Sequence, residues 1–139
     1  MVGIKILNKS QNEILSDRCV DFSARIQTYL DNIQKITTLS DVTMISLEGD
    51  LLAAKGNILL HDIEKHLNDI DKNDLEIVVV PEQLSLILTA QLEELKNVVS
   101  SLKMAKNIQD TVKEKQFQAR INHMRTTIDT IQNKKYITV

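Results

Sequence analysis

The sequence predicts an all-α protein of three or four long antiparallel helices, and three observations support this. Apolar residues recur at alternating spacings of three and four over long stretches, which is the period of one face of a helix. Capping patterns at Ser10 to Glu13 and at Ser40 and Asp41 indicate helix starts. Aromatic residues make up 3% and tryptophan is absent, so the core is expected to consist of leucine, isoleucine and valine.

The first predicted helix begins near Ser10. Ser10 and Glu13 form a capping-box pattern, in which a hydroxyl and a carboxylate satisfy the free N–H groups of a first turn. The apolar stripe that follows consists of Leu15, Cys19, Phe22, Ile26, Tyr29, Ile33 and Ile36. Because Cys19 lies on this stripe, we expect a core residue rather than a reactive thiol. As the only cysteine, it excludes an intramolecular disulfide and a thiolate metal site.

The second predicted helix follows a cap at Ser40 and Asp41. Its stripe consists of Val42, Ile45, Gly49, Leu52, Gly56, Leu59, Ile63, His66 and Ile70. A glycine inside a helix costs about 1 kcal/mol relative to alanine, so glycines on a stripe indicate a close approach by a neighbour or a bend. We therefore expect Gly49, Ala53 and Gly56 to make a close helix contact, either inside the core or with a partner.

Between the second and third helices the sequence turns polar and then strongly apolar. Asp69, Asp71 and Asn73 match the first three ligands of a calcium loop, but Asp74 and Val80 stand where that loop needs glycine and glutamate. The stretch 75–80 has the composition of a strand, and Pro81 suits the first residue of a helix. Residues 76–80 either form a minor β pairing with 4–7 or cross between helices unpaired.

The third predicted helix carries an apolar face of Leu84, Leu88, Leu92, Leu95, Val99 and Leu102. The rhythm slips between Met104 and Gln116 and resumes with Phe117, Ile121, Met124, Ile128 and Ile131. Either one very long helix continues to 133, or a turn without glycine or proline divides it. The chain thus reads as one domain: a helical hairpin over 1–72, a joint over 73–81 and a helical segment over 82–139.

The charge is uneven along the chain. Residues 1–102 hold 9 basic and 16 acidic side chains, whereas residues 103–139 hold 8 basic and 3 acidic ones. This basic end either packs near the acidic front or offers an anion-binding stripe, for which Lys106, Lys113 and Arg120 have the spacing of one helix face. Nucleic-acid association through that stripe is the alternative function, although the pI near 5.9 and the few aromatic residues argue against it.

Catalytic and metal-binding patterns are not found. His61 and His66 are five residues apart, which is not the zinc spacing, and Asp62, His66 and Asp69 share a face on which capping and ion pairing are the commoner roles. A phosphate loop and a nucleophile elbow are missing from the sequence. We expect no enzyme activity, no cofactor and no metal. A signal peptide or membrane span is not expected either, so the predicted location is cytoplasmic, or exported without a cleaved signal.

A family resemblance follows from two segments. Residues 77–84, which lead into a helix rich in glutamine, glutamate and leucine, resemble the opening of the small helical-hairpin WxG proteins of type VII secretion. Leu47, Glu48 and Gly49 stand roughly where that family has its turn, but position 47 is not tryptophan. The resemblance implies a helical hairpin that pairs with another helical protein and helps to deliver an effector.

The function predicted from the sequence is that of a non-catalytic interaction module, an adaptor or chaperone-like protein. It would dock helix-on-helix with a helical partner or with a second copy. The stripe expected to dock consists of Phe117, Ile121, Met124 and Ile128, with a structural core role as the alternative.

Overall fold

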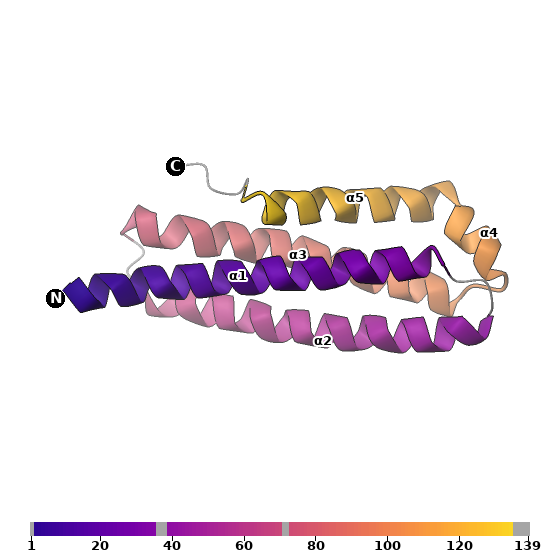
Figure 1. Cartoon of the computed structure of the whole chain (residues 1–139), viewed down its shortest axis with the longest axis horizontal. Helices are drawn as coiled ribbons and strands as arrows, with labels where there is room; N and C mark the ends of the chain where they lie inside the picture. Colours follow the sequence, from indigo (N-terminus) through magenta and orange to yellow (C-terminus); the bar gives the residue numbers. More distant parts are fainter. Residues whose placement is uncertain (1, 36–38, 71–72, 135–139) are drawn as a thin grey trace.

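The computed structural model describes the backbone of residues 2–35, 39–70 and 73–134, and the side chains of 11–35, 41–70, 73–74 and 78–134. Within these ranges the protein is all-α, as predicted, and contains no strand. The helices are α1 (Val2–Ile33), α2 (Leu39–Asp69), α3 (Leu75–Lys103), α4 (Ile108–Lys113) and α5 (Lys115–Gln132). The three longest helices and α5 alternate in direction and form an elongated antiparallel bundle (Figure 1).

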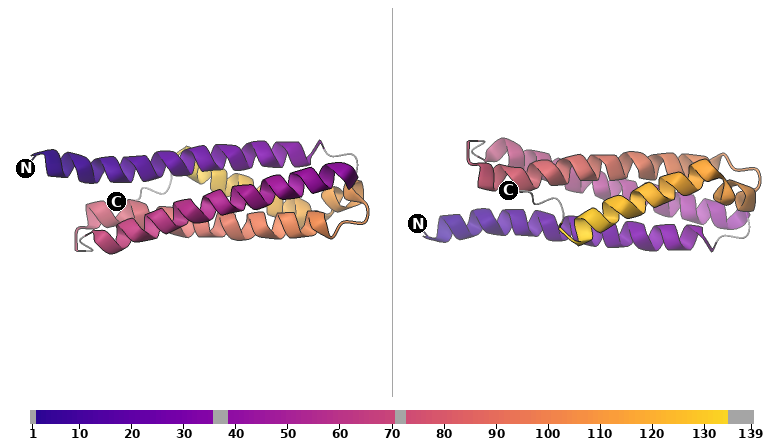
Figure 2. Two further views of the ribbon diagram at one scale, coloured as in Figure 1. Left: turned by 90° about the horizontal axis from the view of Figure 1, so that it is seen from below. Right: turned by 90° about the horizontal axis from the view of Figure 1, so that it is seen from above.

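α1 and α3 form the centre of this bundle. Both helices pack against α2 on one side and against α5 on the other. The two opposite views in Figure 2 show this order, with α2 nearest the viewer in the left view and α5 nearest in the right view. α5 has 18 residues and α1 has 32, so α5 covers only part of the length of the α1–α3 pair.

α1 begins at Val2, so the predicted start near Ser10 is wrong. Extending an existing helix adds one hydrogen bond for each residue fixed, which costs far less than nucleating a new helix, so α1 continues on the N-terminal side of the capping pattern. The predicted apolar stripe is confirmed from Leu15 to Ile33, where each member has an exposed fraction of 4% or less. Ile36, its last predicted member, lies outside the described residues.

The predicted β pairing is wrong, because residues 4–7 lie in α1 and residues 76–80 lie in α3. The Asp74 carbonyl accepts the hydrogen bond of the Val78 N–H at 3.2 Å and so opens α3 before Pro81. Val78 is buried and Val80 packs against the core. Burying such side chains is worth more than the few tenths of a kcal/mol by which valine disfavours a helix.

Pro81 therefore lies inside α3 and not at its first residue. It is buried, and the helix continues through it although proline cannot donate to the carbonyl four residues earlier. Residues 75–81 of the predicted joint over 73–81 thus belong to α3, which begins at Leu75. The preceding helix, α2, ends at Asp69.

A turn divides the C-terminal segment, which confirms the second of the two arrangements that the sequence allowed. α3 ends at Lys103, and Asn107 caps the short helix α4. The Asn107 side-chain oxygen accepts hydrogen bonds from the backbone N–H groups of Gln109 at 3.1 Å and Asp110 at 3.2 Å. The turn thus uses an asparagine cap where the sequence has no glycine or proline.

Candidate protein-docking surface

The glycines of α2 make the predicted close contacts, and they make them with helices of the same chain. A Cβ atom at Gly49 would overlap the Tyr29 hydroxyl of α1 and a methyl group of Val99 in α3. A Cβ atom at Gly56 would overlap Leu92 of α3 and the Phe22 ring of α1. Both glycines are therefore in contact with α1 and α3 of the same chain, and their faces are not open to a partner.

Ala53 lies between these glycines and is half-buried. It lines a groove of about 600 Å³ between α2 and α3, together with charged side chains that include Asp50, Lys96 and Lys103. Asp50 and Lys103 join the two helices by an ion pair of 2.8 Å. The groove is thus an open seam between two packed helices, and its charged groups are partly paired with each other.

The stripe predicted to dock a partner closes the bundle instead. Phe117, Ile121, Met124 and Ile128 have exposed fractions of 3%, 1%, 0% and 5%. They belong to the core cluster, and α5 packs on α1 and α3. In this arrangement a partner could reach these side chains only if α5 left the bundle.

The predicted anion-binding residues do not share one helix face. Lys106 lies in the turn before α4, Lys113 is the last residue of α4, and Arg120 lies in α5. The spacing of seven residues places side chains on one face only within a continuous helix, and the chain bends twice between these three positions. Anion or nucleic-acid binding by these residues stays a prediction.

The other residues considered for chemistry have structural neighbours. Asp62 pairs with Arg18 at 2.9 Å, and His66 Nε2 lies 3.1 Å from Asn12 Oδ1. Burial raises the pKa of the Cys19 thiol to about 12, although Arg18 opposes this, so the thiol is protonated at neutral pH. In the part of the chain that the structure describes, no three histidine, cysteine, aspartate or glutamate side chains form a group suited to a metal ion.

The exposed face of α2 carries an apolar stripe that was not predicted from the sequence. Met44, Leu47, Leu51 and Ile58 have exposed fractions of 63%, 55%, 57% and 61%, and Ala54 between them is also exposed. Successive spacings of three, four, three and four residues align all five on one side of the helix. We call these five residues the α2 outer stripe. The stripe from Val42 to Ile63 lies on the other side of α2 and points into the bundle.

Large exposed apolar residues are concentrated on this stripe. Four of the seven that the described ranges contain belong to it. The other three, Ile14, Leu86 and Met104, are spread over α1, α3 and the turn that follows α3. Single exposed leucines are ordinary in soluble proteins, but an aligned row on one helix is not.

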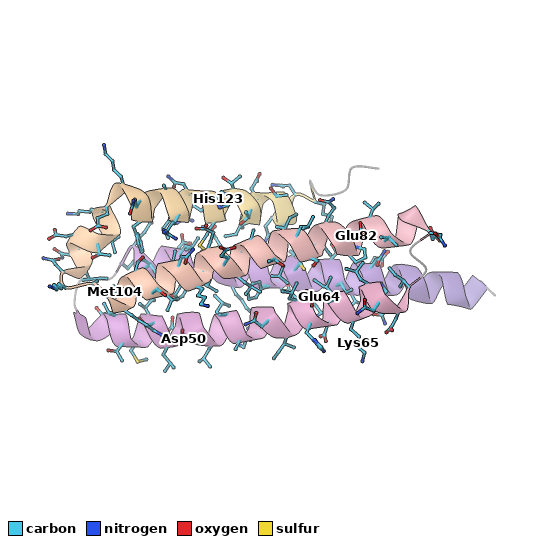
Figure 3. All side chains as sticks on the ribbon, turned by 180° about the vertical axis from the view of Figure 1, so that it is seen from behind. Asp50, Glu64, Lys65, Glu82, Met104 and His123 are labelled. Atoms are coloured by element: carbon cyan, nitrogen blue, oxygen red, sulfur yellow. The ribbon has the colours of Figure 1, made fainter. Side chains whose placement is uncertain are left out.

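Charged residues border the α2 outer stripe on both sides. Asp62, which pairs with Arg18, marks the edge next to α1, and Glu48 and Lys55 are at seven-residue spacings along the same edge. Asp50, which pairs with Lys103, marks the edge next to α3. Figure 3 shows side chains projecting from α2 away from the bundle, with Asp50 toward the end where α3 finishes and Lys65 toward the other end.

The sequence contains a signal for this surface. The sequence of α2 contains two apolar patterns with alternating spacings of three and four. The pattern that begins at Val42 has more members and therefore indicates the face in the core. The second begins at Met44 and runs along nearly the opposite side of the helix. When one apolar face of α2 packs in the core, the second apolar face remains exposed.

No protein family, no curated protein and no solved structure matches the chain. The segments likened to the WxG proteins lie within helices, Leu47 to Gly49 in α2 and 77–84 in α3. Among the helices of the described ranges, none combines the length and the apolar character that crossing a lipid bilayer requires.

Proposed function

We propose that this chain is a non-catalytic interaction module that docks helix-on-helix with a helical partner, either another protein or a second copy of itself, through the α2 outer stripe. The single observation that supports this is the row of five exposed apolar residues from Met44 to Ile58. Rows with this spacing are the contact elements of coiled coils and of helices bound in grooves.

Exposure of this apolar row to water has a free-energy cost. Full burial of one leucine or isoleucine is worth about 1.5–3 kcal/mol, and three such residues of the stripe keep more than half of their surface exposed. Substituting them by polar residues would leave the core of the bundle intact, because Leu52, Leu59 and Ile63 already fill the inner side of α2. A partner helix that covers the stripe recovers this free energy.

The narrower role of an adaptor in effector secretion rests on the resemblance to the WxG proteins alone. It would be a special case of the same docking, with a secreted helical protein as the partner. The test of docking does not depend on it.

Photo-crosslinking tests the proposal. A benzophenone amino acid at position 51 should form covalent adducts with a protein in cells of the native host, and the adducts should disappear when Leu47→Lys is added. The matched control is the same amino acid at position 86, because Leu86 is 66% exposed but lies on α3, outside the stripe. Equal labelling at both positions, or none at position 51, would contradict the proposal.

A further inference from the structure

We infer that the α2 outer stripe pairs with the same stripe of a second copy of this chain, antiparallel to it, about a two-fold axis between Leu51 and Ala54. This inference rests on the proposed docking function and names its partner. Three features of the stripe carry it: the order of large and small residues, the charges beside them and the position of α2 in the bundle.

The order of side chains suits an antiparallel pair. With the axis between Leu51 and Ala54, Leu51 lies opposite Ala54 of the second copy, and Leu47 lies opposite Ile58 of the second copy. Each large side chain near the axis then faces a small one, which lets the helices approach closely. A parallel pair would instead place alanine on alanine at 54, which leaves a cavity, and histidine on histidine at 61, whereas the antiparallel register places His61 opposite Met44.

The charges that border the stripe fit the same register. On the edge next to α1, Glu48 comes beside Lys55 of the second copy, and the two-fold axis repeats this pair. Lys55 lines a hollow between α1 and α2 with Arg18 and Arg25, so the incoming carboxylate meets a predominantly basic rim. On the edge next to α3, Asp50 is bound to Lys103 and faces the neutral Asn57 of the second copy.

At each end of the seam, two negatively charged side chains come close to each other. There Asp41 comes near Asp62 of the second copy, but Asp62 is already paired with Arg18 at 2.9 Å. The Arg18 side chain is 40% exposed, so in the dimer its charge would be close to both carboxylates. The two pairs of Glu48 and Lys55 are attractive, and Arg18 already neutralises Asp62, so the charges together favour this register.

The place of α2 in the bundle leaves this face open. α2 packs on α1 and α3, and α5 lies on the far side of that pair (Figure 2). A seam made by one helix of each copy is smaller than the ~800 Å² per partner of a standard stable interface. We therefore expect a reversible dimer with a dissociation constant of roughly micromolar order.

Sedimentation velocity over a concentration series tests the inference with charge exchanges that leave the core untouched. Glu48→Lys and Lys55→Glu each turn two attractive pairs into two repulsive ones, so each should weaken the dimer about tenfold. The double variant Glu48→Lys/Lys55→Glu should restore the wild-type constant. An equimolar mixture of the two single variants should form a heterodimer, because both of its pairs are then attractive.

Cysteine pairing tests the direction. Leu51→Cys and Ala54→Cys, carried on differently tagged chains and mixed, should give a mixed disulfide faster than either variant alone gives a symmetric one. Faster symmetric disulfides would mean a parallel pair and would overturn the inference. The buried Cys19 stays out of the reaction, and circular dichroism of each variant checks that the bundle is folded.

Two outcomes separate this inference from the proposed function. A chain that remains monomeric up to about a hundred times the expected constant overturns the dimer, and so does a dimer indifferent to the charge exchanges. In either case, stripe-dependent adducts between position 51 and a different protein would still support docking. Adducts only between copies of this chain, together with the pattern above, support both.

Discussion

Tyr29 explains why α2 needs glycine at position 49. Its ring is buried, and its hydroxyl donates a hydrogen bond of 2.8 Å to the Ile45 carbonyl of α2. This contact holds the side chain of α1 directly against the α2 backbone one turn before Gly49. Burial, assisted by Glu48 and Asp50, raises the pKa of the Tyr29 phenol above its usual range, so the hydroxyl keeps its proton and remains a donor.

Alanine at the two glycines of α2 should therefore have unequal costs. Gly49→Ala forces the anchored Tyr29 and Val99 to move, and we expect a loss of about 1–3 kcal/mol in unfolding free energy despite the better helix propensity of alanine. Gly56→Ala meets the flexible end of Leu92 as well as the Phe22 ring, so its loss should be smaller. Urea unfolding measures both, and a stabilised Gly49→Ala variant would contradict the packing described.

His66 gives the bundle a pH dependence of known sign. Burial lowers the pKa of its imidazole, although Asp69 opposes this, so the folded protein favours the neutral ring. The unfolded chain takes up the proton near pH 6.5, so stability is fully present above that pH and is lost as the pH falls below it. Urea unfolding at pH 7.5 and 5.5 should show a larger decrease for the wild type than for His66→Gln.

A second histidine substitution serves as the control for that experiment. His61→Gln removes an exposed imidazole from the same helix and leaves the contact between His66 and Asn12 in place. It should retain the wild-type decrease between the two pH values. If both variants lose the dependence equally, burial of His66 is not its cause.

At the scale of the helix, α2 shows that adjacent leucines can have opposite roles. Leu52 is 8% exposed and belongs to the core cluster, whereas Leu51 is 57% exposed. Leu52→Ala should cost about 2–4 kcal/mol through lost burial and a cavity, and Leu51→Ala should change the unfolding free energy by less than about 0.5 kcal/mol. Protein concentrations well below the expected dimer constant keep association out of the measurement, and similar losses at both sites would contradict the assignment of faces.

Helical periodicity made the buried face of each long helix predictable. The inward side of a helix recurs every 3.6 residues, so alternating spacings of three and four identify it without reference to the neighbours. The stripes from Leu15 to Ile33, from Val42 to Ile63 and from Leu84 to Leu102 were predicted in this way, and all of their members are buried. His66 and Ile70, the last predicted members of the second stripe, are half-buried. The all-α class follows from the same signal.

The remainder depended on information that a local pattern does not contain. Residues 75–80 have a strand composition, yet burial of Val78 in the bundle outweighs that propensity. The start of α4 uses the Asn107 cap, and the sequence offers many other polar residues that could cap a helix equally well. The apolar pattern of a stripe also does not tell which helices cover it. α1 and α3 cover the stripe of Phe117, Ile121, Met124 and Ile128 (the Phe117 stripe), whereas the α2 outer stripe stays exposed.

In the whole molecule, two residues of the basic C-terminal part form ion pairs with the acidic front. The basic C-terminal part meets the acidic front through Arg125 and Asp31, 3.2 Å apart, and through Lys103 and Asp50. Such partly exposed pairs contribute about 0–1 kcal/mol each, so they orient α5 and the end of α3 rather than hold the bundle together. The larger contribution is apolar, because the inner side of α5 is 5% exposed or less at Phe117, Ile121, Met124, Ile128 and Ile131.

This apolar closure predicts that α5 opens only with the rest of the bundle. Native-state hydrogen exchange should give amides of residues 118–131 opening free energies within about 1 kcal/mol of those at 88–100 in α3, because separating α5 would expose its whole inner side and the α1–α3 pair beneath. α4 is the internal control: among its six residues only Ile108 is buried, so its amides should exchange first. Opening of α5 several kcal/mol below the global value would contradict this, and would make the Phe117 stripe accessible to a partner.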